Sequence, residues 1–404
     1  MRNYILALTI LAAGCTQNPQ PVAESNSPVG SWRMSLFLGP DTLQTDVTIN
    51  DSLHFLFHNA AEVIKTTKAS YKNDSLFVEM PVFHSYFLLH QNSNDEIIGA
   101  WYNPGKSPEY QIPVSFNRVT AHSELPNTTD TLKYAVTFSE HTEDAYPAVG
   151  LFLTQDGHIS GTFLTETGDY RYLEGVISGD RWKFQCFDGS HAFLFTATHK
   201  GDSLSNGTFY SGNHWSEPWK GNIDTAATLR NPYSLTYLVD ESDFEFTAMS
   251  LEGEITKFNP STNKGKVTIV QIFGSWCPNC LDESLFYKQL YSSYHDQGLE
   301  IVPVAFEKGD DFSSNVNRLR KYASDLNLPF MSYLGGKASK AEASKIFPML
   351  NAISSFPTTI FLDRSGTVRR IHTGFYGPGT GTHYERFISD TRNFIEDLLN
   401  EETL

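Results

Sequence analysis

The sequence predicts an all-β antiparallel region followed by an α/β domain at about residues 240–404. Two observations predict this order. Residues 28 to about 225 form short runs rich in β-branched and aromatic residues, and Asn-Asp, Gly-Pro and Asn-Pro-Gly turns separate these runs. After that region, apolar strand-like runs alternate with helical segments, which is typical of a sheet flanked by helices.

Length and charge narrow the class of protein. The 404 residues should form two or three domains, because single hydrophobic cores usually stop growing well before that length. The formal net charge of -16 argues against nucleic acid as a partner, since phosphates attract basic surfaces. No stretch beyond the N-terminal segment is apolar for long enough to span a membrane.

Residues 1–15 have the pattern of an export signal. Arg2 precedes an apolar run that is too short for a membrane span, and small residues lead to Cys15. The segment resembles a bacterial lipoprotein signal, which implies cleavage before Cys15, acylation of this residue and a lipid anchor in the cell envelope, facing the periplasm. A secretory signal with an accidental cysteine is the alternative. Residues 16–27 are expected to be a flexible tether.

The β-rich region is expected to contain two similar modules, at 28–125 and 126–228, of about six strands each, or else one larger barrel or sandwich. Three segments of the first module, 73–77, 84–87 and 98–102, have loose counterparts at 179–183, 190–193 and 206–210. The predicted strands of the first module are Trp32–Leu38, Thr42–Ile49, Leu53–Phe57, Glu62–Tyr71, Ser75–Met80, Ser85–His90 and Ile97–Tyr102.

The aromatic residues and histidines of this region allow two interpretations. They could line a pocket for a ligand or an unfolded peptide, or they could pack across the faces of the sheets. The residues concerned are Trp182, His191, Tyr210, His214, Trp215 and Trp219. Cys186 stands alone in a strand-like run and is expected to be a small buried residue.

The α/β domain is expected to begin near residue 240, after a junction at 229–252. Its predicted strands are Val267–Phe273, Leu299–Phe306, Asn327–Leu334, Thr358–Asp363 and Thr367–His372. The first predicted helix carries Cys277 and Cys280 and continues over Leu281–Gln297, and the later segments are Val316–Leu326, about Lys337–Phe347 and His383–Asn400. The glycine-rich segment 376–381 lacks the lysine of a phosphate-binding loop, so an ordinary loop is favoured.

Cys277 and Cys280 lie where the strand Val267–Phe273 ends and a helix begins. Unpaired backbone N–H groups and the helix dipole favour a thiolate at Cys277, and Pro278 suits the first helical turn. Cys280 lies one turn further on, so the two sulfurs can form a disulfide. Half of a zinc site is the alternative, but the chain has no second pair of cysteines at such a spacing. The pattern favours a redox pair, and we expect no metal and no cofactor.

Several motifs together resemble the TlpA/ResA-type thiol-disulfide oxidoreductases of the thioredoxin superfamily. They are Gly265-Lys266-Val267 and the strand, Trp276-Cys277-Pro278-Asn279-Cys280, Glu283, Phe356-Pro357-Thr358-Thr359 and the segment 360–366. The resemblance covers about residues 240–404 and implies a thioredoxin-like fold. It says nothing about the β-rich region.

The resemblance implies a role for each matching residue. Cys277 attacks a substrate disulfide and Cys280 resolves the mixed disulfide, while Pro357 corresponds to the family's cis-proline facing the pair. Trp276, Pro278, Phe356 and Thr358 are expected to contact the substrate. Glu283 corresponds to the family's active-site glutamate and could accept a proton from Cys280, or it could be a solvated carboxylate like Asp282. Thioredoxin's buried aspartate has no counterpart, because Gln271 occupies that position.

These expectations define one principal function and three alternatives. The principal function is reduction of disulfides in extracytoplasmic proteins, by resemblance often during cytochrome c biogenesis, with electrons from a membrane thiol transporter. The alternatives are an oxidising or isomerising role, a thiol peroxidase, and a binding lipoprotein whose β-rich half captures a ligand. The sequence does not identify the substrate or the direction of electron flow.

Overall fold

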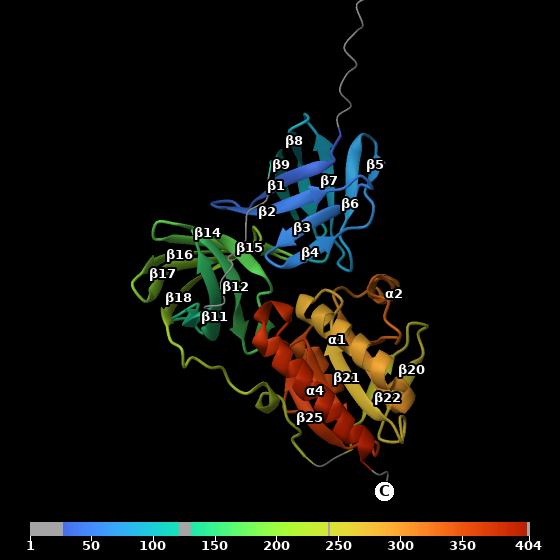
Figure 1. The fold of residues 1–404 in the computed structure, drawn as a ribbon. Helices are drawn as coiled ribbons and strands as arrows, with labels where there is room; N and C mark the ends of the chain where they lie inside the picture. Colours follow the sequence, from blue (N-terminus) through green and yellow to red (C-terminus); the bar gives the residue numbers. More distant parts are fainter. Residues whose placement is uncertain (1–26, 121–130, 241–242, 402–404) are drawn as a thin grey trace, which may run out of the picture.

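The computed structural model describes residues 27–120, 131–240 and 243–401, and these residues form three sheets. Two all-β regions lie together at the N-terminal end of the described chain, and the α/β domain lies below them in Figure 1. The predicted signal at 1–15, with Cys15, and residues 16–26 of the tether lie outside the described residues. No helix in the described part of the chain is long and apolar enough to cross a membrane.

The first sheet is open and strongly curved. The described residues 30–118 form nine strands in the order β4-β3-β2-β1-β9-β8-β7-β6-β5. They are β1 (Gly30–Phe37), β2 (Thr42–Ile49), β3 (Phe55–Asn59), β4 (Glu62–Lys65), β5 (Ser70–Lys72), β6 (Ser75–Glu79), β7 (Tyr86–Gln91), β8 (Glu96–Tyr102) and β9 (Gln111–Arg118). Alternate residues of most strands are buried, as in β3 and β6, so one face carries the core.

The second sheet closes on itself as a barrel. The described residues 131–223 form nine strands, and β10 pairs with both β11 and β18 while β12 pairs with both β11 and β14. The strands are β10 (Thr131–Phe138), β11 (Tyr146–Gln155), β12 (His158–Thr165), the short β13 (Gly168–Asp169), β14 (Leu173–Ser178), β15 (Arg181–Phe187), β16 (Ala192–Lys200), β17 (Ser203–Ser211) and β18 (Trp215–Ile223). Closure leaves no long exposed edge.

The two β regions share one topology, which confirms the predicted repeat. In both, the last strand pairs with the first, and the predicted counterpart segments fall on β6 and β15, β7 and β16, and β8 and β17. The prediction of about six strands per module was wrong, because the short edge strands and β9 had no clear signal. The single larger barrel or sandwich is also excluded. The predicted strand Glu62–Tyr71 is two strands, β4 and β5, at opposite edges of the first sheet.

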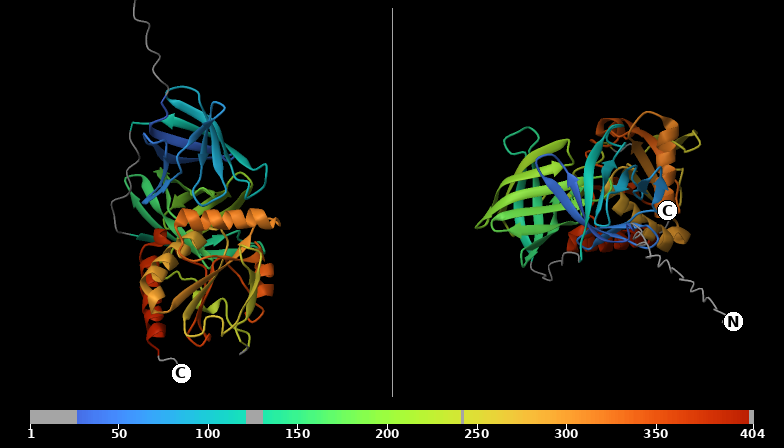
Figure 2. Two further views of the ribbon diagram at one scale, coloured as in Figure 1. Left: turned by 90° about the vertical axis from the view of Figure 1, so that its right-hand side faces the viewer. Right: turned by 90° about the horizontal axis from the view of Figure 1, so that it is seen from above.

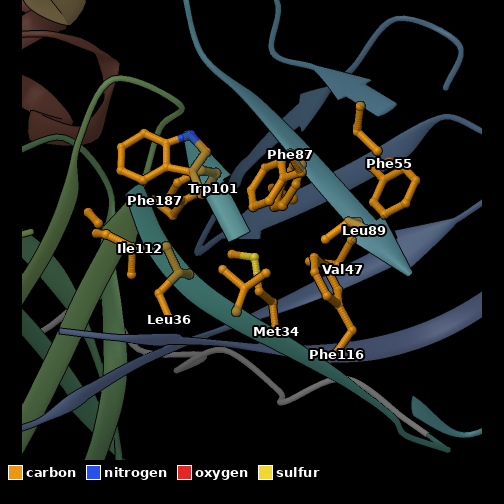
Figure 3. Packing of buried hydrophobic residues seen from close by; sticks show 14 of the residues in the cluster. Met34, Leu36, Val47, Phe55, Phe87, Leu89, Trp101, Ile112, Phe116 and Phe187 are labelled. Carbon is orange, nitrogen blue, oxygen red and sulfur yellow. The ribbon is translucent and has the colours of Figure 1, made fainter. Parts of the chain in front are cut away.

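The two β regions are joined by a shared core. Phe187, at the end of β15, is fully buried among the side chains of the first sheet, as Figure 3 shows. Its ring lies 5.1 Å from that of Trp101, 5.3 Å from that of Phe57 and 5.6 Å from that of Phe87. Complete burial of one such side chain contributes about 1.5–3 kcal/mol. The barrel and the first sheet therefore pack as one body.

The third sheet belongs to the α/β domain and has seven strands within residues 243–401, in the order β20-β19-β23-β22-β21-β24-β25. Its elements are β19 (Phe246–Met249), β20 (Ile255–Phe258), β21 (Val267–Phe273), α1 (Pro278–Tyr294), β22 (Leu299–Glu307), α2 (Phe312–Leu326), β23 (Tyr333–Lys337), α3 (Lys340–Ile346), β24 (Thr358–Leu362), β25 (Val368–Thr373) and α4 (Thr382–Asn400). The left view of Figure 2 shows helices on both sides of this sheet.

The central strand β21 positions the functional site. Every residue of β21 is buried, as expected of a strand covered on both faces, and it runs parallel to β22 and antiparallel to β24. Three predicted boundaries were wrong. The helix predicted from about Lys337 begins at Lys340, because Lys337 is the last residue of β23. The strand predicted at Asn327–Leu334 begins at Tyr333, and α2 begins four residues before its predicted start because Asp311 caps it and accepts a hydrogen bond from the Ser314 N–H.

Candidate redox site

The site begins where β21 ends. After Gly274 and Ser275 the chain enters α1, with Cys277 as the N-cap in extended conformation and Pro278 in the first turn. The Cys277 sulfur accepts a hydrogen bond from the Cys280 N–H at 3.2 Å, so the sulfur takes the place of an ordinary capping oxygen. Cys277 and Cys280 are joined as a disulfide with their Cα atoms 5.2 Å apart. The helix N-terminus thus faces the sulfur that would carry negative charge after reduction.

The two sulfurs differ in access. Cys277 is 6% exposed and Cys280 is completely buried, so only Cys277 can meet a substrate. The Phe356–Pro357 peptide bond is cis, as the resemblance implied, and the Phe356 carbonyl oxygen lies 3.5 Å from the Cys277 sulfur. The Trp276 ring lies edge-on to the Phe356 ring, with 5.7 Å between the centroids. The expected substrate-contacting residues Trp276, Pro278 and Phe356 therefore surround Cys277.

The Thr358 side chain points away from this surface. It is completely buried, and its hydroxyl donates a hydrogen bond to the Ser355 carbonyl at 2.9 Å. Unlike the other residues expected to contact a substrate, Thr358 therefore uses its side chain to stabilise the loop before the cis-proline.

Glu283 lies beneath the pair and has no exposed surface, so the interpretation as a solvated carboxylate was wrong. Its carboxylate accepts hydrogen bonds from Gln271 Nε2 at 2.8 Å, the Thr359 hydroxyl at 2.9 Å and the Tyr287 hydroxyl at 3.0 Å. Burial raises the pKa of Glu283 to about 7, although these three hydrogen bonds oppose the rise. Gln271 also contacts the Cys280 carbonyl oxygen at 3.4 Å, so it links Glu283 to the buried cysteine.

Asp282, the neighbouring acid, has a different and unexpected role. It is buried, and its carboxylate accepts a hydrogen bond from Arg171 Nη1 at 2.7 Å. The same nitrogen lies 3.3 Å from the Pro278 carbonyl oxygen, and Nη2 contacts Glu62 of the first sheet. Burial raises the pKa of Asp282, and the Arg171 guanidinium offsets part of that rise. One arginine of the barrel region therefore joins all three domains beside the cysteine pair.

The hairpin between β12 and β14 of the barrel packs directly on the redox site. The Thr167 carbonyl accepts a hydrogen bond from the Ser355 hydroxyl at 3.0 Å. The Asp169 carboxylate accepts one from the Gly377 N–H, and Asn279 Nδ2 lies 3.4 Å from the Asp169 carbonyl oxygen. The barrel thus covers one side of the surface around Cys277.

A pocket of about 290 Å³ remains above Cys277 between the barrel and the α/β domain. Barrel residues Arg171, Asp188 and His191 form one wall, and Cys277, Phe356 and Lys340 lie across from them. Asp188 accepts a hydrogen bond from the backbone N–H of His191 and lies 3.2 Å from its ring. Burial lowers the pKa of His191, which Asp188 opposes. The barrel and the α/β domain therefore both border the space next to Cys277.

Several other candidate residues of the sequence have structural roles, whereas Trp215 is 53% exposed. Trp182 and Trp219 are almost fully buried in the barrel core, which confirms packing for these two, and Cys186 is buried beside them. In the glycine-rich segment, the Tyr376 hydroxyl donates to the Thr165 carbonyl at 3.0 Å, so this loop docks the barrel. Within the described residues, no group of three or more His, Cys, Asp or Glu side chains could hold a metal ion.

Arg171, Asp169 and Ser190 were missed by sequence reasoning. Ser190 donates a hydrogen bond to the Trp276 carbonyl at 3.0 Å. Each of these residues lies between 86 and 208 positions from its partner in the redox domain. No local motif marks contacts over such a separation.

Comparison with known proteins matches the C-terminal part of the chain. A family model described as Redoxin matches residues 242–385. The thioredoxin-like protein YneN of Bacillus subtilis (strain 168) is 27% identical over 130 residues, which are 32% of this chain and 68% of YneN. The thiol-disulfide oxidoreductase ResA of Geobacillus thermodenitrificans (strain NG80-2) is 26% identical over 130 residues, which are 32% of this chain and 66% of ResA.

Solved structures were also matched. A crystal structure of a thioredoxin family thiol:disulfide interchange protein from Chlorobium tepidum TLS is 19% identical, with 43% of this chain and 100% of that chain covered and a TM-score of 0.29. The Redoxin match does not include the first sheet or the barrel, because both precede residue 242. With a cysteine pair at the start of α1, a cis-proline beside it and relatives that are named as a thioredoxin-like protein and as a thiol-disulfide oxidoreductase, the C-terminal domain is a ResA-type member of the thioredoxin superfamily and a thiol-disulfide oxidoreductase.

Proposed function

We propose that this protein reduces disulfides outside the cytoplasm, with Cys277 as the nucleophile and Cys280 as the resolving thiol. The observation that carries this proposal is the placement of Cys277 as a partly exposed helix cap above the buried Cys280 and Glu283. The relatives named as thiol-disulfide oxidoreductases support the same chemistry.

The reaction has two exchange steps. The Cys277 thiolate attacks one sulfur of the substrate disulfide, forms a mixed disulfide and expels the other substrate sulfur as a thiolate. The Cys280 thiolate then attacks the Cys277 sulfur, which releases the second substrate thiolate and leaves the pair oxidised. The substrate gains two electrons and the cysteine pair loses two. A membrane thiol transporter is the proposed donor that reduces the pair again.

Glu283 is the proposed proton acceptor for Cys280. A thiol must lose its proton before it attacks, and a carboxylate is an efficient base when its pKa lies near the working pH. The pKa of Glu283 is about 7, and Gln271 connects its carboxylate with the Cys280 segment. Glu283→Gln should therefore slow resolution of the mixed disulfide more than its formation, as rapid mixing followed by acid quench would measure. Equal slowing of both steps would contradict this role.

The proposed location is the periplasmic face of a bacterial membrane, with Cys15 acylated. The small residues before Cys15 and the polar segment after it support a lipid anchor and a tether. Cys15→Ser should abolish incorporation of a labelled fatty acid and release the protein from the membrane fraction. Retention of the label in that variant would refute the anchor at this residue.

Trapping tests the proposed function as a whole. Cys280→Ser leaves the mixed disulfide on Cys277 unresolved, so substrates remain covalently attached and can be identified by mass spectrometry. Apoproteins of cytochrome c are among the proposed substrates. The matched control is Cys277→Ser, which retains Cys280 but lacks the nucleophile. The same set of attached molecules in both variants would count against Cys277 as the attacking thiol.

A further inference from the structure

A second and larger cavity lies next to the redox site, between the first β sheet and the α/β domain. Its volume is about 680 Å³, and its walls come from the loops after β6 and β8, from Ser190 of the barrel and from the start of α2. Val82, Phe83 and Trp276 give it an apolar side. A cavity of this size can enclose a small organic molecule.

The carboxylates that line this cavity already have partners. Glu307 is fully buried and accepts hydrogen bonds from the backbone N–H and the hydroxyl of Ser275, each at 2.8 Å. Asp310 pairs with Lys337 at 2.7 Å. Asp311 caps α2. Each of these carboxylates therefore already has a hydrogen-bond or ion-pair partner.

Two lysines at the cavity form no ion pair. Among the described residues, no carboxylate lies within 4.0 Å of the ammonium group of Lys106 or Lys308, whereas Arg318 pairs with Glu307 and Lys321 pairs with Asp325. Burial and the nearby Lys308 ammonium lower the pKa of Lys106 to about 8, and the Asp188 carboxylate opposes only part of this change. The cavity is lined by four basic side chains (Lys106, Lys308, Arg318 and Lys321) and three acidic ones (Glu307, Asp310 and Asp311), so the lining is slightly positive in a chain with a formal net charge of -16.

The cavity and the pocket at the redox site share Trp276. This residue lines both spaces, and the Lys308 ammonium lies 4.9 Å from its ring centroid. Ser190, which holds the Trp276 carbonyl, also lines the cavity. The two spaces are therefore neighbours, and a molecule whose disulfide lies at Cys277 would have to pass Trp276 to reach the two lysines.

We propose that this cavity binds the carboxylate groups of a low-molecular-weight disulfide substrate, with Lys106 and Lys308 as the residues that recognise the negative charge. The proposal rests on the proposed disulfide reduction and specifies its substrate class. A small substrate suits the site because barrel residues cover one side of the surface around Cys277, where the pocket is only about 290 Å³. The pair passes two electrons to the bound disulfide, as in the steps above, and each departing thiolate takes a proton from water.

The test compares three disulfides that differ in charge. The full chain is reduced with dithiothreitol, freed of it, and mixed with oxidised glutathione (anionic), bis(2-hydroxyethyl) disulfide (neutral) or cystamine (cationic), and thiol release gives second-order rate constants. The variants are Lys106→Gln and Lys308→Gln. Lys264→Gln, in an exposed turn outside the cavity, is the matched control for net charge, and Lys308→Arg keeps the charge in place.

We expect oxidised glutathione to react fastest with the unchanged chain. Each glutamine variant should lower this rate by about tenfold, the typical effect of losing one charge-assisted hydrogen bond, and should leave the rate with the neutral disulfide unchanged. Lys264→Gln should change neither rate, and Lys308→Arg should keep most of the preference. Equal rates for the three disulfides, or equal losses for the anionic and neutral ones, would overturn the proposed site. Failure of the unchanged chain to reduce any of the disulfides would instead count against the proposed function.

Discussion

Replacing Glu283 with glutamine should stabilise the redox domain progressively as the pH rises, relative to the unchanged chain. The carboxylate has no exposed surface, and only three neutral groups, Gln271, Tyr287 and Thr359, donate hydrogen bonds to it. Its negative charge is therefore costly in the folded state. Glutamine keeps one acceptor oxygen and carries no charge, so any loss of hydrogen-bond geometry in the variant is the same at all pH values.

The sign and size of the effect follow from the pKa. It is raised from 4.5 to about 7 by burial, so between these values the folded chain holds a proton that the unfolded chain has released. The free energy of unfolding of the unchanged chain therefore falls as the pH rises through this window. The contribution of this one group amounts to about 2.5 kcal/mol between pH 5 and pH 8. Glu283→Gln removes that contribution.

The assay is a urea series on the oxidised full chain at pH 5 and pH 8, with pulse proteolysis and mass spectrometry of peptides from β21 and α1. Because the peptides come from one domain, they report the unfolding transition of that domain separately from those of the first sheet and the barrel. The stability of the variant minus that of the unchanged chain should rise by about 2.5 kcal/mol from pH 5 to pH 8. Glu385→Gln, an exposed position on α4, is the control. A pH-independent difference for Glu283→Gln would refute the buried, high-pKa carboxylate.

Three further predictions concern access and docking. After reduction, iodoacetamide at neutral pH should label Cys277 and leave Cys280 unmodified, since only the first has exposed surface; labelling of both by peptide mass spectrometry would contradict the geometry. Arg171→Met should lower the free energy of unfolding by about 3–5 kcal/mol, because it leaves the buried carboxylates of Glu62 and Asp282 without their positively charged partner. A loss below about 1 kcal/mol in urea titrations would show that Arg171 does not stabilise these carboxylates. Gly168→Ala should speed alkylation of Cys277, because its Cβ would lie 1.8 Å from Asn279 Nδ2 and displace the covering hairpin; an unchanged rate would show that the hairpin does not limit access.

The sequence was most informative where the signals are local. A run of mostly apolar and β-branched residues followed by a Gly-Ser break predicted β21, and the proline after Cys277 predicted the start of α1. The cis peptide bond before Pro357 could be predicted from the family motif alone. These features could be predicted because neighbouring residues determine each of them.

Features set by distant contacts could not be predicted. The segment Glu62–Tyr71 is rich in strand-forming residues and has no turn signal, yet the chain leaves the sheet after β4 and re-enters at the opposite edge. Tertiary hydrogen bonds impose this path: the Thr66 N–H donates to the Phe55 carbonyl, and the Ala69 N–H donates to the Leu53 carbonyl. Intrinsic preference for a strand was correct for β4 and β5, but it did not reveal that residues 66–69 leave the sheet or which strands β4 and β5 pair with.

The two adjacent acids of α1 show how domain packing and redox chemistry meet. Both lie in the first turns of the same helix, but Asp282 faces the barrel and pairs with Arg171, whereas Glu283 faces β21 and the buried cysteine. Arg171 Nη1 also lies 3.3 Å from the Pro278 carbonyl oxygen, so the barrel contacts the first turn of the helix that Cys277 caps. The carboxylates of Glu62, Asp188 and Asp282 surround the guanidinium and offset its charge. If the barrel moved away, Asp282 would be left buried without its partner. Attachment of the β region therefore stabilises the first turns of α1 and shapes the pocket above Cys277.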